Sequence, residues 1–432
     1  MLAAAATRQE LPPQAPQSRR AFGALFGLGL VAAPLYAIAL RLPERPFLFT
    51  ALFTALCALY AASCRLVLHH NGARLPVREA LPVIVLFALA YRLILVPAEP
   101  WLSDDFFRYV WDGFIQGEGY SPYHYPPRAA ELEGLRDDYY WPRVNRKEQT
   151  SAYPPFAELA FRLLFGVKPF STVAFKLGFL TIDLATIGLL YLLLRDRGQS
   201  PLGLIVYAWH PLPPFEFFGN AHIDVLAVLL LVLALLLQAR GHPLGAGVAL
   251  GLATLTKLYP GLLLPAFTRR GHWHLPLAWL ATVVAGFAPA LLAGDTNFRQ
   301  FPTYVREEGY DSGERYFPLL LLRLIAPVPA AAYVVAVAIV LLALSLRLYL
   351  RPGAFDVPRR ALWLAATIML LVTPAYPWYF TWLLPLLALV PVPGLLFLTG
   401  VAALIYLGWG WFLPQQISPK PLVAFQYCST WA

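Results

Sequence analysis

Two adjacent aspartates, Asp104 and Asp105, stand in the stretch WLSDDFFRYVWDGFIQGEGYSPYHYPP (101–127), which follows an apolar run ending near Pro97. A carboxylate placed beside a membrane can deprotonate an acceptor hydroxyl, or hold a divalent cation such as magnesium or manganese next to a lipid-borne leaving group. The structural alternative is a helix capped by Ser103, whose first turn would contain both carboxylates and stabilise its dipole.

Two cations are placed where they could meet a phosphate. Arg108 falls three or four residues beyond the aspartates, on the same face of a helix, and could keep a carboxylate ionised or bind a phosphate. Lys257, in LTKLYPG, is flanked by apolar residues and could bind the phosphate of a lipid donor. A lysine that extends its ammonium group to the membrane interface is the alternative.

The stretch HPLPPFEFFGNAHIDVL (210–226) carries two histidines, a glutamate and an aspartate around a helix break. His222 and Asp224 are two residues apart, so a helix does not place them on one face, and this stretch alone indicates a metal site only weakly. The tyrosines and prolines of 117–127 could stack on a sugar, although aromatic residues also suit a membrane-interface belt.

Composition places these residues in a membrane protein. Of the 432 residues, 59% are hydrophobic and 13% are charged, whereas soluble domains carry about a quarter charged residues. Apolar runs near the ~20-residue spanning length recur along the chain. The three cysteines have no metal-ligand spacing, which disfavours a zinc site or a disulfide framework. The net charge of +9 is attributed to cytoplasmic loops rather than to nucleic-acid binding.

The distribution of basic residues predicts the orientation of the helices. Arg19 and Arg20 flank the first apolar run (21–40), and a second basic cluster (65–78) separates the runs at 47–68 and 78–97. Placing both clusters in the cytoplasm sends the third run outward and leaves residues 98–168 exoplasmic, although the two arginines of RLPER then lie outside. The N-terminal 1–20 is expected to be a disordered cytoplasmic segment.

The later apolar runs follow the same alternation, with one exception. Residues 243–268 begin and end beside basic runs, and at ~1.5 Å per residue a segment of this length cannot cross the membrane twice. Two half-helices that meet at TLTKLYPG (254–261) solve the problem, because broken helices are tolerated where they line a protein cavity. The other expected spans are 170–194, 201–218, 221–238, 275–293, 329–350, 361–376, 381–390 and 394–413.

The predicted fold is an all-α polytopic membrane protein, a single domain over 21–432 with about 11–13 transmembrane or re-entrant helices. Its large exoplasmic loop, 98–168, is expected to carry interfacial helices. With this topology five separated segments converge on one face, which favours a site there over scattered loop residues. The candidate residues on this face are Asp104, Asp105, Arg108, Tyr153, Asn220, His222, Asp224, Lys257, Tyr259 and Arg315.

Seven stretches together resemble the GT-C superfamily of glycosyltransferases. SDDFFRY, WDG, GEGYSPY and AYPPFAEL resemble its first exoplasmic loop, and GNAHIDVLAVLLLVLALLL resembles a Gly-Asn-x-x-x-Asp helix start. GVALGLATLTKLYPGLLLP and TPAYPWYFTWLLPL resemble the Lys-x-Tyr-Pro helix and the late Pro-x-x-Trp-Tyr loop. The most similar branch contains bacterial polyprenol-phosphate-mannose-dependent mannosyltransferases and the catalytic subunit of GPI mannosyltransferase I.

The resemblance implies transfer of a sugar from a polyprenyl-phosphate donor to an exoplasmic lipid or glycan acceptor, with inversion, at the bacterial inner membrane. It implies that Asp105, heading D-x-x-R-Y, is the general base, with Asp104 second, and that Lys257 meets the donor phosphate, with Tyr259 beside it and Arg315 or Arg108 assisting. The family's acidic motif is often D-x-D, whereas this chain has D-D, so the base and any metal at these two aspartates stay open.

Two functions from other classes compete with an enzyme. A transporter or flippase would place acids deep in several spans and show repeat symmetry, but Asp183 is the one strong candidate for a deep acid and no repeat is visible. A non-catalytic subunit of a larger complex is disfavoured by the clustered polar loops. The sequence leaves the sugar, the acceptor, the oligomeric state and any partner subunit open.

Overall fold

A computed structural model describes residues 15–42, 45–68, 75–295, 301–351, 353 and 355–407, and every regular element in these ranges is helical. The predicted all-α polytopic membrane fold is confirmed. Five of the described helices are long and apolar enough to cross a membrane: Ser18–Ala39, Pro46–Leu68, Thr172–Asp196, His274–Leu292 and Ala330–Leu350. Residues 69–74, Cys428 and the end of the last expected span lie outside the described ranges.

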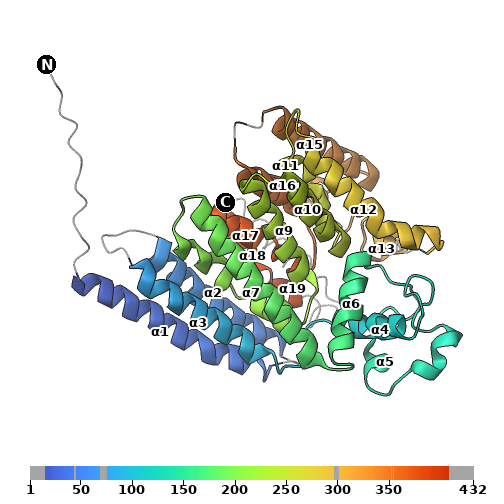
Figure 1. Ribbon diagram of the computed structural model, residues 1–432, viewed down its shortest axis with the longest axis horizontal. Coiled ribbons are helices and arrows are strands. Elements are labelled where there is room, and N and C mark those ends of the chain that lie inside the picture. The colour runs from blue at the N-terminus through green and yellow to red at the C-terminus, as the bar shows by residue number, and fades with distance from the viewer. Residues whose placement is uncertain are drawn as a thin grey trace.

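The N-terminal three helices lie side by side at one end of the molecule (Figure 1). They are α1 (Ala15–Ala39), α2 (Pro46–Leu68) and α3 (Val77–Leu95). The stacked rings of Tyr36 and Tyr91, 4.6 Å between centroids, join α1 to α3. Because α1 begins at Ala15, the expectation of a disordered 1–20 is wrong for 15–20, whose arginines and glutamine are good helix formers.

The segment between α3 and the next span forms a compact helical layer (Figure 1). It contains α4 (Asp105–Gly117), the 3₁₀ turn η1 (Ala130–Leu135), α5 (Tyr140–Arg143) and α6 (Pro155–Val167). Gly113 lets α4 pack directly on α6, because a Cβ atom at this position would lie 2.5 Å from the Phe161 carbonyl oxygen. The glycine of the WDG motif is therefore a packing requirement.

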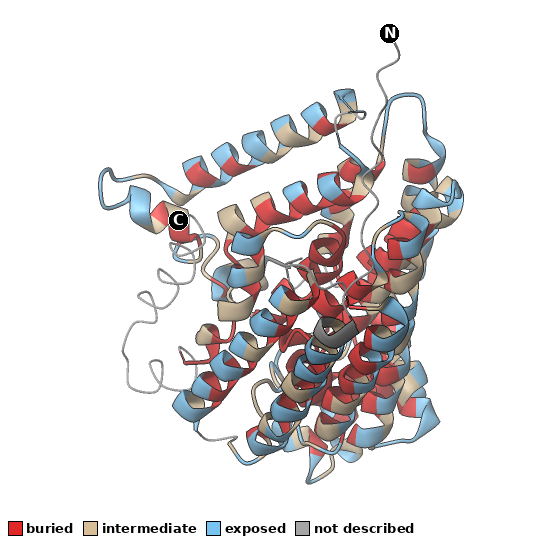
Figure 2. Ribbon diagram, turned by 90° about the vertical axis from the view of Figure 1, so that its left-hand side faces the viewer, coloured by how far each residue is buried: buried red, intermediate tan, exposed pale blue. Residues whose placement is uncertain are grey.

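The middle of the bundle is made by α7 (Thr172–Asp196), α9 (Asp224–Ala239) and α10 (Pro243–Thr256). α10 also packs along α12 (His274–Leu292). At Gly247 a Cβ atom would lie 2.4 Å from the Leu275 carbonyl oxygen, so the glycine permits this contact. Buried residues concentrate in these central helices, while the outer helices show exposed faces (Figure 2).

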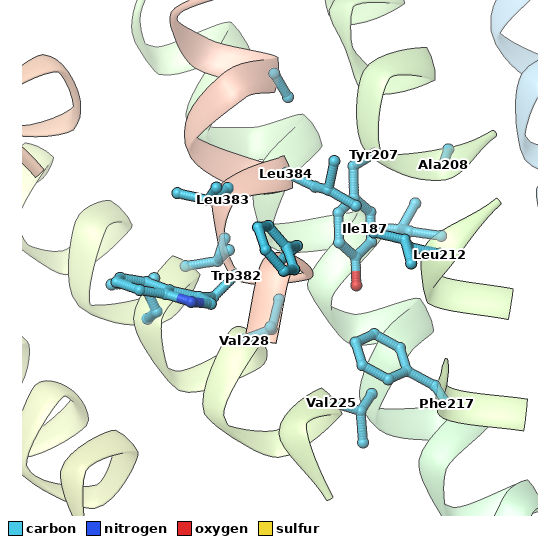
Figure 3. Close-up of a cluster of buried hydrophobic side chains, with 14 of the residues drawn as sticks. Ile187, Tyr207, Ala208, Leu212, Phe217, Val225, Val228, Trp382, Leu383 and Leu384 are labelled. Carbon is cyan, nitrogen blue, oxygen red and sulfur yellow. The ribbon is translucent and has the colours of Figure 1, made fainter. Parts of the chain in front are cut away.

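The single span expected at 201–218 is wrong. The chain instead forms η2 (Pro201–Leu204), α8 (Ile205–Ala208) and a π-helical turn, η3 (Pro214–Gly219). Prolines at 211, 213 and 214 remove successive backbone donors, which a continuous α-helix cannot accommodate. The broken segment is enclosed by protein: Tyr207 and Phe217 pack among apolar side chains of α7, α9 and α17 (Figure 3).

The break predicted within 243–268 is confirmed. α10 ends at Thr256, and the chain resumes as η4 (Tyr259–Leu263) and α11 (Leu264–Phe267). The remaining helices complete the bundle: α13 (Phe301–Glu307), α14 (Phe317–Leu322), α15 (Ala330–Leu350), α16 (Val357–Val372), η6 (Pro377–Phe380), α17 (Leu383–Leu389), α18 (Pro393–Val401) and α19 (Leu404–Leu407).

Candidate active site

A cavity of about 2000 Å³ lies where the separated polar segments meet. Its walls come from the start of α4, the 142–154 loop, the break after α10, α13, and the 374–382 segment. A further wall is apolar and is made by the first turns of α15 and the last turns of α16. Six predicted site residues line this cavity: Asp104, Asp105, Arg108, Tyr153, Lys257 and Tyr259.

The two aspartates occupy different positions at the start of α4. The helix begins at Asp105 and Asp104 is the N-cap residue, so the structural alternative, a Ser103 cap with both carboxylates in the first turn, holds only for Asp105. The Ser103 hydroxyl accepts a hydrogen bond from the Asp105 amide at 3.3 Å. The side-chain amide of Asn145 donates to Oδ1 of Asp104 at 2.9 Å and to Oδ1 of Asp105 at 2.8 Å.

The surroundings of Asp104 raise the pKa of its carboxyl group. Desolvation at the cavity wall raises the pKa of Asp104, and the neighbouring charge of Asp105 raises it further, while the Asn145 hydrogen bond opposes both effects. The Asp105 carboxylate reaches deeper into the protein. Its Oδ2 lies 3.8 Å from Nδ1 of His222, a fully buried histidine.

The helix break after α10 delivers Lys257 to the cavity. Its ammonium lies 3.3 Å from Oδ2 of Asp224, and the hydroxyl of Tyr259 donates to the other Asp224 oxygen at 3.0 Å. The ammonium also lies 4.9 Å from the centre of the Tyr153 ring, within cation–π range. Lys257 is thus bound on its buried side by one carboxylate and bordered on the cavity side by aromatic rings.

Three predicted residues lie behind the cavity wall and support residues that line it. His222 stacks on the Trp378 ring at 3.9 Å between centroids, and its Nε2 lies 3.6 Å from Glu216. Asn220 accepts a hydrogen bond from the Leu102 amide at 3.2 Å and thereby fixes the chain before the aspartates. The third residue is Asp224, whose carboxylate lies beside the Lys257 ammonium. Glu216, the residue next to His222 in space, belongs to the π-helical turn η3, and such turns recur at functional sites.

Each of the two arginines proposed for the donor phosphate forms an ion pair with a carboxylate of the protein. Nε of Arg108 donates to both oxygens of Asp112 at 2.7 and 2.9 Å, and its Nη1 donates to the carbonyls of Arg146 and Gln149. Arg315 does not line the cavity, and it forms an ion pair with Glu308, which does. Arg108 therefore braces the 142–154 loop, and Arg315 braces the loop that follows α13 (308–316).

Sequence reasoning missed Asn145, Arg146 and Glu308, all of which line the cavity. Arg146 pairs with Glu308 at 3.1 Å and with Glu307 at 3.5 Å, and the hydroxyl of Tyr376 also bonds Glu308. The stretch VNRKEQT has the composition of a solvated loop, and its partners are far away in sequence. No local pattern would have identified these contacts.

Backbone strain is concentrated at this site. The described chain has four non-glycine residues with positive φ, and three of them are Arg146 (45°), Ala221 (59°) and Thr373 (48°). Arg146 follows Asn145, Ala221 stands between Asn220 and His222, and Thr373 begins the TPAYPW segment. Residues held in this region cost ~1–3 kcal/mol each and cluster at functional sites.

The described residues contain no group of three or more His, Cys, Asp or Glu side chains arranged to hold a metal ion.

Asp183, the deep acid that a transporter would use, is fully buried and bonded to Arg92 and to the Tyr207 hydroxyl. It does not line the cavity.

The sequence profile of glycosyltransferase family 87 matches residues 152–374, just over half of the chain. The matched range includes Lys257, Tyr259 and Arg315, and it begins after Asp104 and Asp105. Comparisons with curated proteins and with solved structures find no match.

Proposed function

The chain belongs to glycosyltransferase family 87, a family of the GT-C type, and we propose from this premise that it transfers a sugar from a polyprenyl-phosphate donor to a lipid or glycan acceptor. Mannose is the first candidate sugar, because the motifs resemble polyprenol-phosphate-mannose-dependent enzymes; glucose and pentoses are the alternatives. The site faces the periplasm of a bacterial inner membrane in this proposal, as the basic loops predict.

One observation carries the proposal: a single cavity joins paired carboxylates, a lysine and an apolar wall. Asp105 and Lys257 both line it, and so do Val334 and Val335 of α15, which are 41% and 58% exposed. A polyprenyl phosphate needs this combination, since its phosphate seeks a cation and its hydrocarbon chain seeks apolar surface. The volume of about 2000 Å³ exceeds the ~300–1000 Å³ of a single-ligand pocket, so donor and acceptor fit together.

In the proposed reaction Asp105 accepts the proton of the acceptor hydroxyl as that oxygen attacks the anomeric carbon of the donor sugar. The new carbon–oxygen bond forms on the face opposite the phosphate, the bond from that carbon to the phosphate oxygen breaks, and the configuration inverts. Polyprenyl phosphate leaves with the bonding electron pair, and Lys257 stabilises its charge.

The other predicted residues have supporting roles in this proposal. Tyr259 and Asp224 hold Lys257, Tyr153 borders the sugar, and His222 supports Asp105 from behind. Since Nε and Nη1 of Arg108 are bonded within the protein, we assign Arg108 to the loop rather than to the phosphate. Any divalent cation would have Asp104 and Asp105 as its carboxylates, and no step here depends on one.

The test uses purified full-length protein in lipid nanodiscs, radiolabelled polyprenyl-phosphate mannose, and bacterial membrane lipids as acceptors. Wild-type protein should transfer label, and Asp105→Asn should reduce transfer by ~10²–10⁴-fold, the usual contribution of a general base. Asp138→Asn, an exposed carboxylate of the same loop that does not line the cavity, is the matched control and should keep full activity. Absence of transfer with mannose, glucose and pentose donors, or full activity of Asp105→Asn, would contradict the proposal.

A further inference from the structure

The adjacent carboxylates at the start of α4 share one hydrogen-bond donor. Consecutive residues at a helix start point in different directions, so Asp104 and Asp105 do not meet through helix geometry alone. The Asn145 amide nitrogen nevertheless lies 2.9 Å from Oδ1 of one and 2.8 Å from Oδ1 of the other. A side-chain amide carries two N–H groups, and here each serves a different carboxylate.

The loop that carries Asn145 is held from several directions. The next residue, Arg146, has a left-handed φ of 45°, and its carbonyl accepts from Nη1 of Arg108 at 3.4 Å. The Arg146 side chain binds Glu308, and the Gln149 side chain donates to Glu307 at 2.6 Å. A strained backbone conformation persists only where the surrounding contacts enforce it. The contacts of Arg146 and Gln149 therefore fix the position of Asn145 independently of the two aspartates.

This bridge constrains how the two carboxylates face the cavity. With both Oδ1 atoms directed at Asn145, the remaining oxygen of Asp105 lies on the side of His222, while Asp104 stays exposed at the wall. Two adjacent anions repel each other, and a donor placed between them offsets the repulsion. Removing Asn145 would leave each carboxylate able to rotate away from its place beside the acceptor.

We propose that Asn145 is a positioning residue that sets the geometry of the catalytic carboxylates. This inference rests on the proposed function, because it assumes that Asp105 is the base. Asn145 acts through Asp104 and Asp105, because its side-chain amide donates to both carboxylates. Its loss therefore lowers the rate of the chemical step more than it weakens donor binding, since a misplacement of ~1 Å costs ~10²-fold in rate.

The experiment compares Asn145→Ala and Asn145→Leu with wild type in the same protein, measuring kcat and KM for polyprenyl-phosphate mannose and the melting temperature of each variant. Leucine is close to asparagine in size but offers no hydrogen-bond donor, so this variant tests the bond without removing volume. Both variants should lose ~10²-fold in kcat with KM within ~3-fold and an unchanged melting temperature. Glu148→Ala, an exposed residue of the same loop outside the cavity lining, should behave as wild type.

A double-mutant cycle adds a readout that a structural role does not produce. Asn145→Ala should cost less in an Asp104→Asn background, because only one carboxylate then remains to be held. The inference would be overturned by a wild-type kcat in both Asn145 variants. It would also be overturned if Asn145→Ala lowered kcat equally with and without Asp104→Asn. In either case an inactive Asp105→Asn variant would leave the proposed function standing. An active Asp105→Asn variant would instead remove the proposed function.

Discussion

Two charged clusters lie inside the bundle, and they differ in how completely each charge is neutralised. In the first, Asp183 of α7 is bonded to Arg92 of α3 and to the hydroxyl of Tyr207, and all three are fully buried. In the second, Asp104 and Asp105 face a cavity with a shared amide donor, and Lys257 has one carboxylate partner. A charged pair enclosed by protein stabilises the bundle, whereas charges that face a cavity can bind and react.

The largest expected effect is the difference in stability between the variants Asp183→Asn and Asp105→Asn. Asp183→Asn should lower the free energy of unfolding by about 3–5 kcal/mol, because it leaves Arg92 buried without a counter-charge. Asp105→Asn should leave stability close to wild type, since this carboxylate is partly exposed. Thermal unfolding in detergent measures both. Equal stability of the two variants would remove the distinction between the clusters.

Lys257→Gln tests the cation of the open cluster. The glutamine keeps a polar group near Asp224 but cannot neutralise a leaving phosphate, so kcat should fall by ~10²–10³-fold. Lys176, a buried lysine of α7 that donates to backbone carbonyls, offers the comparison. Lys176→Gln should affect stability more than the rate of the folded fraction. A Lys257→Gln enzyme with wild-type kcat would argue against phosphate stabilisation by this residue.

Glu308→Gln should give an intermediate effect. Glu308 is buried and binds Arg146, Arg315 and the Tyr376 hydroxyl, so it joins the loop of Asn145 to α13. A charged hydrogen bond contributes ~1.5–3 kcal/mol, and its loss should reduce activity by about tenfold or more. Limited proteolysis should cut the 142–154 loop faster in this variant. Unchanged proteolysis and unchanged activity would show that the two loops do not depend on each other.

The smallest effect is a pH-dependent change in stability at Asp104. Its pKa is raised in the folded protein by desolvation and by Asp105, so folding loses stability as pH rises from below the unfolded pKa near 3.8 through the raised value. Asp104→Asn removes this penalty and should raise the melting temperature slightly at neutral pH. The difference from wild type should vanish at acidic pH. A lower melting temperature at neutral pH would contradict the sign.

Sequence patterns predicted the fold well where the length of a segment decides the outcome. The short segment between two basic runs predicted the break that carries Lys257, and the structure has it after Thr256. The run at 201–218 misled, because its apolar composition fits a membrane span while its prolines interrupt the helix. An apolar segment buried in the protein core and an apolar segment that spans the membrane have the same composition, so composition alone does not distinguish them.

The candidate site was predictable in part. Asp105 and Lys257 were predicted because carboxylates and cations are rare in apolar surroundings, and Tyr259 because it follows Lys257 in the Lys-x-Tyr-Pro motif; all three line the cavity. The Arg108–Asp112 pair could also have been found, since the two residues are four apart on one helix. Asn145 could not have been, because its partners lie 40 and 41 residues away and a polar loop gives no sign of them.

The apolar wall has a consequence for kinetics. Under the proposed lipid-linked donor, the exposed valines that α15 presents to the cavity would let the donor enter along this wall and stay dissolved in the lipid phase until it reacts. The quantity that saturates the enzyme is then the mole fraction of donor in the bilayer, and the aqueous molarity is irrelevant. At fixed total donor, dilution with inert phospholipid should slow turnover, and dilution with buffer should leave it unchanged.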